Sequence, residues 1–178
     1  MPSKHMNQTL DNNLKDAFLK AYEDWNDAIF RYCFNQTSNR EVALDLASET
    51  FTKTWEYLVR GNTVEQWKPF LYRSATNAII DYRRKKKAVS LDSMMEEGYD
   101  HVGEAAPMGD HEQTFDAEKA MKVVGELPEK YRDVLMLRYV DDLSISEIAE
   151  VTGETENNVS VRIHRGLEKI EEILKPKE

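Results

Sequence analysis

Apolar residues recur in steps of three and four along most of the chain, which is the spacing of one face of an α-helix. The first such stripe begins at Leu14 and predicts an amphipathic helix about 25 residues long. Its members are Leu14, Phe18, Ala21, Tyr22, Trp25, Ile29, Tyr32 and Cys33. Cys33 is the single cysteine of the chain, and its place on this stripe predicts a buried, small apolar side chain.

Two further helices are predicted in the N-terminal half. A cap signal at residues 38–39 opens the second helix, and Gly61 is its expected end. Thr63 is expected to cap the third helix, with Gln66 as its capping-box partner. Pro69 lies within the first two turns of that helix, so the helix either starts late or bends there. The third helix then continues into five consecutive basic residues, Arg83, Arg84, Lys85, Lys86 and Lys87.

The helical periodicity fails from about residue 88 to residue 110, where glycines and a proline interrupt an acidic stretch. Residues 91–126 carry 10 acidic and 2 basic side chains, so their net charge of −8 accounts for most of the −9 of the whole chain. We expect this stretch to be a linker that is flexible in the isolated protein. A short helix is predicted to resume through Phe115 and Leu127, and Pro128 is expected at the N1 position of the next.

These patterns predict an all-α protein of two small helical domains joined by an acidic flexible linker. The expected boundaries are residues 10–87 for the first domain, 88–111 for the linker and 112–176 for the second domain. No stretch approaches the roughly 18 consecutive apolar residues of a membrane span, and the N-terminus lacks the apolar region of a secretory signal. Together with the single cysteine, these features predict a cytoplasmic protein without membrane contact of its own.

The most specific local signal lies near the C-terminus, in "LSISEIAEVTGETENNVSVRIHRGLEKI". Ser146 is expected to start a short helix, Gly153 to make a tight turn and Thr155 to cap the next helix. The second helix keeps one apolar face, made of Val159, Ile163, Gly166, Leu167 and Ile170. A short helix, a glycine turn and a second amphipathic helix form the helix-turn-helix pattern, in which the second helix enters the DNA major groove.

The opposite face of that second helix carries Asn158, Val161 and Arg165, while Arg162 lies at its flank. Asparagine can pair bidentately with adenine, arginine with guanine, and valine can contact a thymine methyl group. The alternative is that these side chains form only a solvated helix face. His164 has no partner at ligand spacing, so a phosphate contact or plain exposure is favoured over a metal site. No cofactor or metal is therefore expected.

Two segments resemble a known family. The segment "LPEKYRDVLMLRYVDDLSISEIAEVTGETENNVSVRIHRGLEKI" is similar to region four of bacterial RNA polymerase sigma factors. "DLASETFTKTW" resembles the polymerase-docking helix of region two, and "FLYRSATNAIIDYRRKKK" resembles its promoter-melting segment. Both regions occur in order with only a linker between them, which is typical of the small two-domain sigma factors of the extracytoplasmic-function group.

The resemblance implies a sigma factor that binds core RNA polymerase and directs promoter-specific initiation without catalysing any chemistry itself. It would read the −35 element with the helix-turn-helix and melt the −10 element with the third helix. The implied partners are core RNA polymerase, promoter DNA and an anti-sigma protein. A stand-alone helix-turn-helix transcription regulator is the alternative, but it would need a sensor or dimerisation domain in the N-terminal half.

The resemblance also implies three sets of site residues. The −35 set is Thr155, Asn157, Asn158, Ser160, Val161, Arg162 and Arg165. The −10 set is Trp67, Phe70, Tyr72, Arg73 and Asn77, although its aromatic members could instead belong to the core. The basic run Arg83, Arg84, Lys85, Lys86 and Lys87 directly extends the same helix, so a grip on the adjacent phosphates is favoured over a helix-end charge complement, a solvated charge run or a localisation signal. The polymerase-docking set is Leu44, Asp45, Glu49, Thr50 and Lys53, whereas Phe51 and Trp55 lie on the apolar stripe and are expected to be structural. The acidic segment 91–118 is expected to pass through the positively charged channels of the polymerase and to repel DNA from the free protein.

Overall fold

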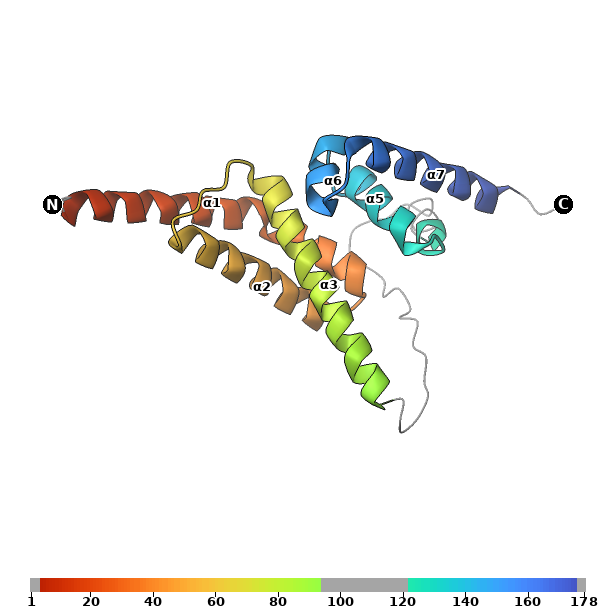
Figure 1. Cartoon of the computed structure of the whole chain (residues 1–178), viewed down its shortest axis with the longest axis horizontal. Helices are drawn as coiled ribbons and strands as arrows, with labels where there is room; N and C mark the ends of the chain where they lie inside the picture. The colour runs from red at the N-terminus through yellow and green to blue at the C-terminus, as the bar shows by residue number, and fades with distance from the viewer. Residues whose placement is uncertain (1–3, 94–121, 176–178) are drawn as a thin grey trace. The chain divides into compact units, whose positions relative to one another are not determined.

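The computed structural model describes residues 4–93 and 122–175, and within these ranges it contains helices and turns but no strand. The chain divides into two compact units, Met1–Ala106 and Pro107–Glu178. Figure 1 shows the helices of both units, which are α1 (Lys4–Thr37), α2 (Arg40–Val59), α3 (Trp67–Ser93), α5 (Glu129–Tyr139), α6 (Ile145–Thr152) and α7 (Glu156–Leu174). The predicted all-α class with two helical domains is therefore confirmed.

The first unit is a bundle in which α1, α2 and α3 pack pairwise against one another. The predicted stripe of α1 supplies Ile29 and Cys33 to its core, and both are fully buried. Cys33 therefore has the structural role that its spacing predicted. Phe51 from α2 packs between two rings of α1, with its centroid 4.8 Å from that of Tyr22 and 6.3 Å from that of Phe18. Phe51 is thus structural, as expected.

The ends of α2 lie where their local signals place them. Asn39 is the N-cap, and its side chain accepts a hydrogen bond of 3.0 Å from the Val42 amide. Gly61 follows the last turn with φ +89°, a left-handed backbone conformation that favours glycine. Both predictions are confirmed.

Helix α3 begins only at Trp67, so Thr63 is not its cap, and the late start expected as one effect of Pro69 is confirmed. Proline has no N–H, and its ring clashes with the carbonyl four residues earlier when it lies inside a helix. Starting at Trp67 places Pro69 in the first turn, where neither problem arises. At its other end α3 continues to Ser93, past the residue 88 at which the linker was expected to begin. The rest of the expected linker, and the start of the short helix expected near Phe115, lie outside the described residues.

The second unit holds the helix-turn-helix. Its first helix, α6, is capped by Ser144 rather than by Ser146: the Ser144 side chain accepts from the Glu147 amide at 3.2 Å, and the Glu147 carboxylate accepts from the Ser144 amide at 2.7 Å. Only Ser144 has a glutamate three residues later, and this reciprocal pair decides where the helix starts. Gly153 ends α6 with φ +69°, and the Thr155 side chain accepts from the Asn158 amide at 3.2 Å. The predicted turn and second cap are confirmed.

Helix α7 approaches α5 closely at Gly166. A Cβ atom at this position would lie 2.8 Å from Cδ1 of Leu135 and 3.4 Å from Cβ of Tyr131. Val134 on α5 and Val159 on α7 are fully buried, so both helices line one core. Pro128 is the N-cap of α5 rather than its N1 residue. The absence of a side chain at Gly166 is what allows α7 to lie this near to α5.

Candidate nucleic-acid and protein-binding surfaces

Helix α7 presents a polar face opposite its buried stripe. Asn157, Asn158, Val161 and Arg165 are all exposed on this face, with Thr155 exposed at its start. Ser160 is also exposed at the edge of the face, and its hydroxyl donates to the Glu156 carbonyl at 2.9 Å. The helix therefore brings six of the seven residues expected to contact the −35 element to its open side.

Arg162 is the exception. Its guanidinium turns back into the unit, where Nε donates to the Lys130 carbonyl at 2.9 Å and Nη2 donates to the same oxygen. Nη1 forms an ion pair with the carboxylate of Glu154. Only 22% of the Arg162 side chain is exposed. The expectation that Arg162 faces DNA is therefore corrected, because its donors already have partners within the unit.

No metal site accompanies the helix-turn-helix in the part of the chain that the structure describes, where no cluster of His, Cys, Asp and Glu suits a metal ion. His164 is exposed, and its Nε2 lies 3.3 Å from a carboxylate oxygen of Glu168 one turn later. This geometry is that of an ordinary surface pair.

The N-terminal half of α3 divides the expected −10 residues between two faces. Arg73 and Asn77 are exposed, and Trp67 and Phe70 are partly exposed. The ring of Phe70 lies between neighbours, 5.1 Å from the ring of Tyr57 and 5.7 Å from the Arg73 guanidinium carbon. Phe70 therefore combines a structural contact with an open side.

Tyr72 belongs to the core rather than to the −10 surface in which it was expected. Only 1% of Tyr72 is exposed, and its ring centroid lies 5.1 Å from that of Tyr32 on α1. It falls on the same face of α3 as the fully buried Leu71 and Ala75. A side chain in this position supports the bundle and cannot stack on an extruded base.

The basic run is also divided by the turn of the helix. Arg84, Lys85, Lys86 and Lys87 are exposed, and Arg84 pairs with Asp81 at 3.0 Å. Arg83 points inward instead, where Nη2 donates to the Gln36 carbonyl at 3.2 Å and to the Gln36 side-chain oxygen at 2.6 Å. Gln36 lies in the last turn of α1, where helix carbonyls lack partners within the helix. Arg83 therefore ties α3 to α1, and the expectation of a phosphate contact passes to the four exposed cations.

Four of the five expected docking residues lie on the outside of α2. Leu44, Asp45 and Lys53 are exposed and Glu49 is half-buried, with the Lys53 ammonium 2.6 Å from the Glu49 carboxylate. This hydrogen bond raises the pKa of Lys53 above its ordinary value. Thr50 is fully buried, and its hydroxyl donates to the Leu46 carbonyl at 2.7 Å. Thr50 is therefore a core residue rather than a docking residue.

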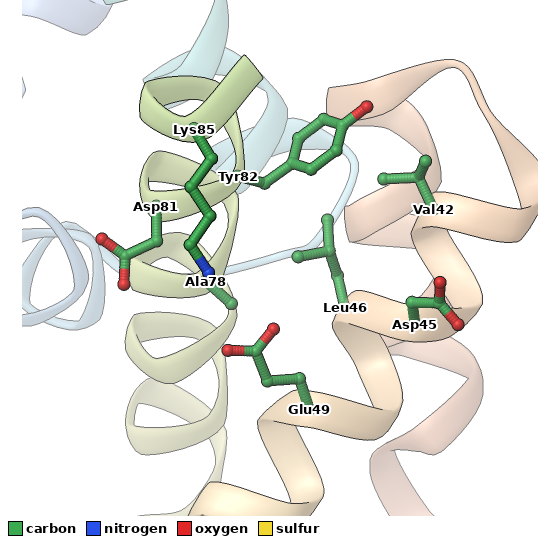
Figure 2. A pocket seen from close by; sticks show the side chains of 8 residues that line it. All are labelled: Val42, Asp45, Leu46, Glu49, Ala78, Asp81, Tyr82 and Lys85. Carbon is green, nitrogen blue, oxygen red and sulfur yellow. The ribbon is translucent and has the colours of Figure 1, made fainter. Parts of the chain in front are cut away.

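A pocket of about 150 Å³ lies between α2 and α3 beside this surface (Figure 2). Asp45 and Glu49 line it from α2, and Asp81 and Lys85 line it from α3. The side chains of Glu49 and Lys85 point toward one another across it. Its apolar and aromatic lining consists of Val42, Leu46, Ala78 and Tyr82. The α3 side of this surface was not predicted, because no local sequence signal shows which face of α3 meets α2.

Known proteins match both units of the chain. Residues 16–89 match the model of the sigma-70 region 2 family, and residues 117–170 match that of sigma-70, region 4. The chain is 30% identical over 169 residues to the ECF RNA polymerase sigma factor SigW of Bacillus subtilis (strain 168), which covers 90% of each chain. It is also 30% identical over 153 residues to the RNA polymerase sigma factor SigV of the same organism, with 86% of this chain and 88% of SigV covered.

Solved structures share the fold. The sigma factor RpoE, from a co-crystal structure with the anti-sigma factor NepR from Bartonella quintana, superposes with a TM-score of 0.73 at 19% identity over 93% of this chain and 99% of its own. CnrH, solved in complex with the cytosolic domain of CnrY, gives a TM-score of 0.65 at 19% identity over 93% and 95%.

The N-terminal half therefore matches a sigma-factor region rather than the sensor or dimerisation domain that a stand-alone regulator would need. Within the described ranges, no helix is both long and apolar enough to cross a membrane. Because the two sigma regions occur in order and relatives match along nearly their whole length, this chain belongs to the ECF family of RNA polymerase sigma factors, which bind core RNA polymerase and direct promoter-specific transcription.

Proposed function

We propose that α7 reads the −35 element of the promoter. The observation that carries this proposal is the open face of α7, where Asn158, Val161 and Arg165 project from the second helix of a doubly capped helix-turn-helix. A good bidentate pair between such a side chain and a base edge contributes about 1–3 kcal/mol of discrimination. Asn158 and Arg165 can form such pairs, and Val161 can contact a thymine methyl group.

Helix α3 is proposed to open the −10 element. Trp67 and Phe70 offer partly exposed rings for stacking, and Asn77 offers an amide to the edge of an extruded base. The four exposed cations from Arg84 to Lys87 would hold the adjacent phosphates. Melting would then be driven by the free energy of binding, and the protein would catalyse no reaction of its own.

The outer face of α2 is the proposed docking surface for core polymerase. Leu44, Asp45 and Lys53 are exposed there, and the acidic pocket of Figure 2 continues the surface towards α3. The exposed carboxylate of Asp45 on this surface would favour a basic side chain on the polymerase. Because core polymerase works in the cytoplasm, we place the protein there as well.

An anti-sigma protein is a further proposed partner. The sigma factor RpoE was captured with the anti-sigma factor NepR, and CnrH with the cytosolic domain of CnrY. The RpoE complex supports the same kind of regulation for this chain. Residues 94–118 of the acidic segment lie outside the described residues, and the proposed passage of this segment through the polymerase stays a prediction.

Reconstituted transcription tests these assignments. Transcript mapping after overproduction would first identify a promoter, and the full chain would then be mixed with sigma-free core polymerase on that template. We expect a promoter-specific transcript that Asn77→Ala and Arg165→Ala each reduce about tenfold or more, as the loss of a contact of 1.4 kcal/mol would. Glu171→Gln, on the exposed end of α7, is the matched control and should transcribe normally. Full activity of both alanine variants would refute the assigned surfaces.

A further inference from the structure

The guanidinium of Arg162 joins three parts of the second unit. It donates to the carbonyl of Lys130, which lies in the first turn of α5. It also pairs with Glu154, which lies in the turn between α6 and α7. Arg162 itself is in the second turn of α7, so one planar group connects α5, the turn between α6 and α7, and α7.

The position of Glu154 makes this connection consequential. It directly precedes Thr155, the N-cap that fixes where α7 begins. Its amide donates to the Ala149 carbonyl at 3.1 Å, and its carboxylate is held by Arg162, so backbone and side chain are both fixed. Movement of this carboxylate would change the direction in which α7 leaves the turn.

We infer that Arg162 is a positioning residue for −35 recognition, which sets the orientation of α7 and neutralises Glu154 beside the DNA-facing turn. This inference rests on the proposed reading of −35 by α7. It gives Arg162 a role different from that of Arg165, which lies three residues later on the open face. Arg165 would contact the promoter, whereas Arg162 would act through the placement of its neighbours.

A direct phosphate contact by Arg162 is the competing explanation. To reach DNA, the guanidinium would have to leave both the Lys130 carbonyl and the Glu154 carboxylate. Glu154, with only 29% of its side chain exposed, would then lose its cation next to an approaching polyanion. Lysine cannot replace the arginine, because a single ammonium group lacks the planar fork that reaches both acceptors.

The test measures sequence discrimination by the holoenzyme. The full chain and its variants are assembled with core polymerase, and affinities are compared for the mapped promoter and for the same fragment with a scrambled −35 element. Arg162→Lys, Arg162→Gln and Glu154→Ala should each lower the affinity ratio about tenfold, equivalent to about 1.4 kcal/mol. Glu154→Gln retains an acceptor oxygen for the guanidinium and should keep most of the ratio. Thermal unfolding by circular dichroism verifies that each variant is folded.

The two explanations predict different changes in the affinities of the variants for the two fragments. A phosphate contact carries no sequence information, so Arg162→Gln would weaken both fragments equally, Arg162→Lys would resemble the wild type, and Glu154→Ala would strengthen binding to both. That pattern, or unchanged ratios in all variants, would overturn the inference. Glu154→Ala tests the pair from its other side even if the Arg162 variants do not fold. A wild-type holoenzyme that ignores scrambling of −35 would instead count against the proposed function itself.

Discussion

Gly166 offers a quantitative test of how α7 is placed. In Gly166→Ala the new Cβ would lie 2.8 Å from Cδ1 of Leu135, well inside the 3.4 Å at which ordinary contacts begin. Leu135 is itself buried, so it has little space into which to move. Overpacking of this kind costs about 1–3 kcal/mol, whereas replacing a helical glycine by alanine gains up to about 1 kcal/mol. We therefore expect a net loss of about 1 kcal/mol, and a larger loss for Gly166→Val.

The distribution of tryptophan provides an internal reference for this measurement. Trp25, Trp55 and Trp67 all lie in the first unit, so tryptophan fluorescence reports on that unit alone. Urea unfolding of Gly166→Ala should leave the fluorescence transition unchanged while the circular dichroism transition of the second unit moves to lower urea. Gly125→Ala is the matched control, because a Cβ at that helical position meets nothing within 4 Å and should be neutral or stabilising.

A double-mutant cycle separates the steric contact from other causes. Leu135→Ala alone should cost about 2–5 kcal/mol. If the contact with Leu135 is what makes Gly166→Ala unfavourable, then the same change in the Leu135→Ala background should become neutral or stabilising. A Gly166→Ala protein as stable as the wild type would refute this reasoning, since Leu135 would then have moved aside at no cost.

Five further outcomes follow from the contacts described above. Thr155→Ala removes the α7 cap and should lower the stability of the second unit by about 1 kcal/mol in urea unfolding. Asn77→Ala should leave the protein stable but slow promoter opening, with activity restored on a template already mismatched at −10, whereas Tyr72→Ala should lose about 3–5 kcal/mol of stability. Arg83→Gln should destabilise the fluorescence-monitored unit, whereas Lys86→Gln should weaken promoter binding without affecting stability.

Local signals predicted those helix ends whose partners lie within a few residues. Asn39 and Thr155 each accept from an amide three residues later, and Gly61 and Gly153 adopt the left-handed conformation that glycine allows. Local physics also explains why Thr63 is not a cap. A helix starting at Thr63 would place Pro69 in its interior, and the cost of an interior proline outweighs the gain from the cap. A helix end can therefore be predicted from sequence when cap residues, glycines and nearby prolines are weighed together.

The surfaces follow a different rule, because the charge of an arginine is evident in the sequence but the partner of its guanidinium is not. Arg162 reaches an acceptor 32 positions away, and Arg83 reaches one 47 positions away. No periodicity or motif within one helix reports contacts of this length, so a list of DNA contacts drawn from a motif includes cations that the fold has already used. Once these cations are removed from the list, the side chains proposed to read −35 are the few that α7 leaves open, chiefly Asn158, Val161 and Arg165. Arg162 is inferred to act on recognition through the placement of its neighbours. Arg162→Lys, which keeps the charge but loses the planar fork, should therefore still lower discrimination.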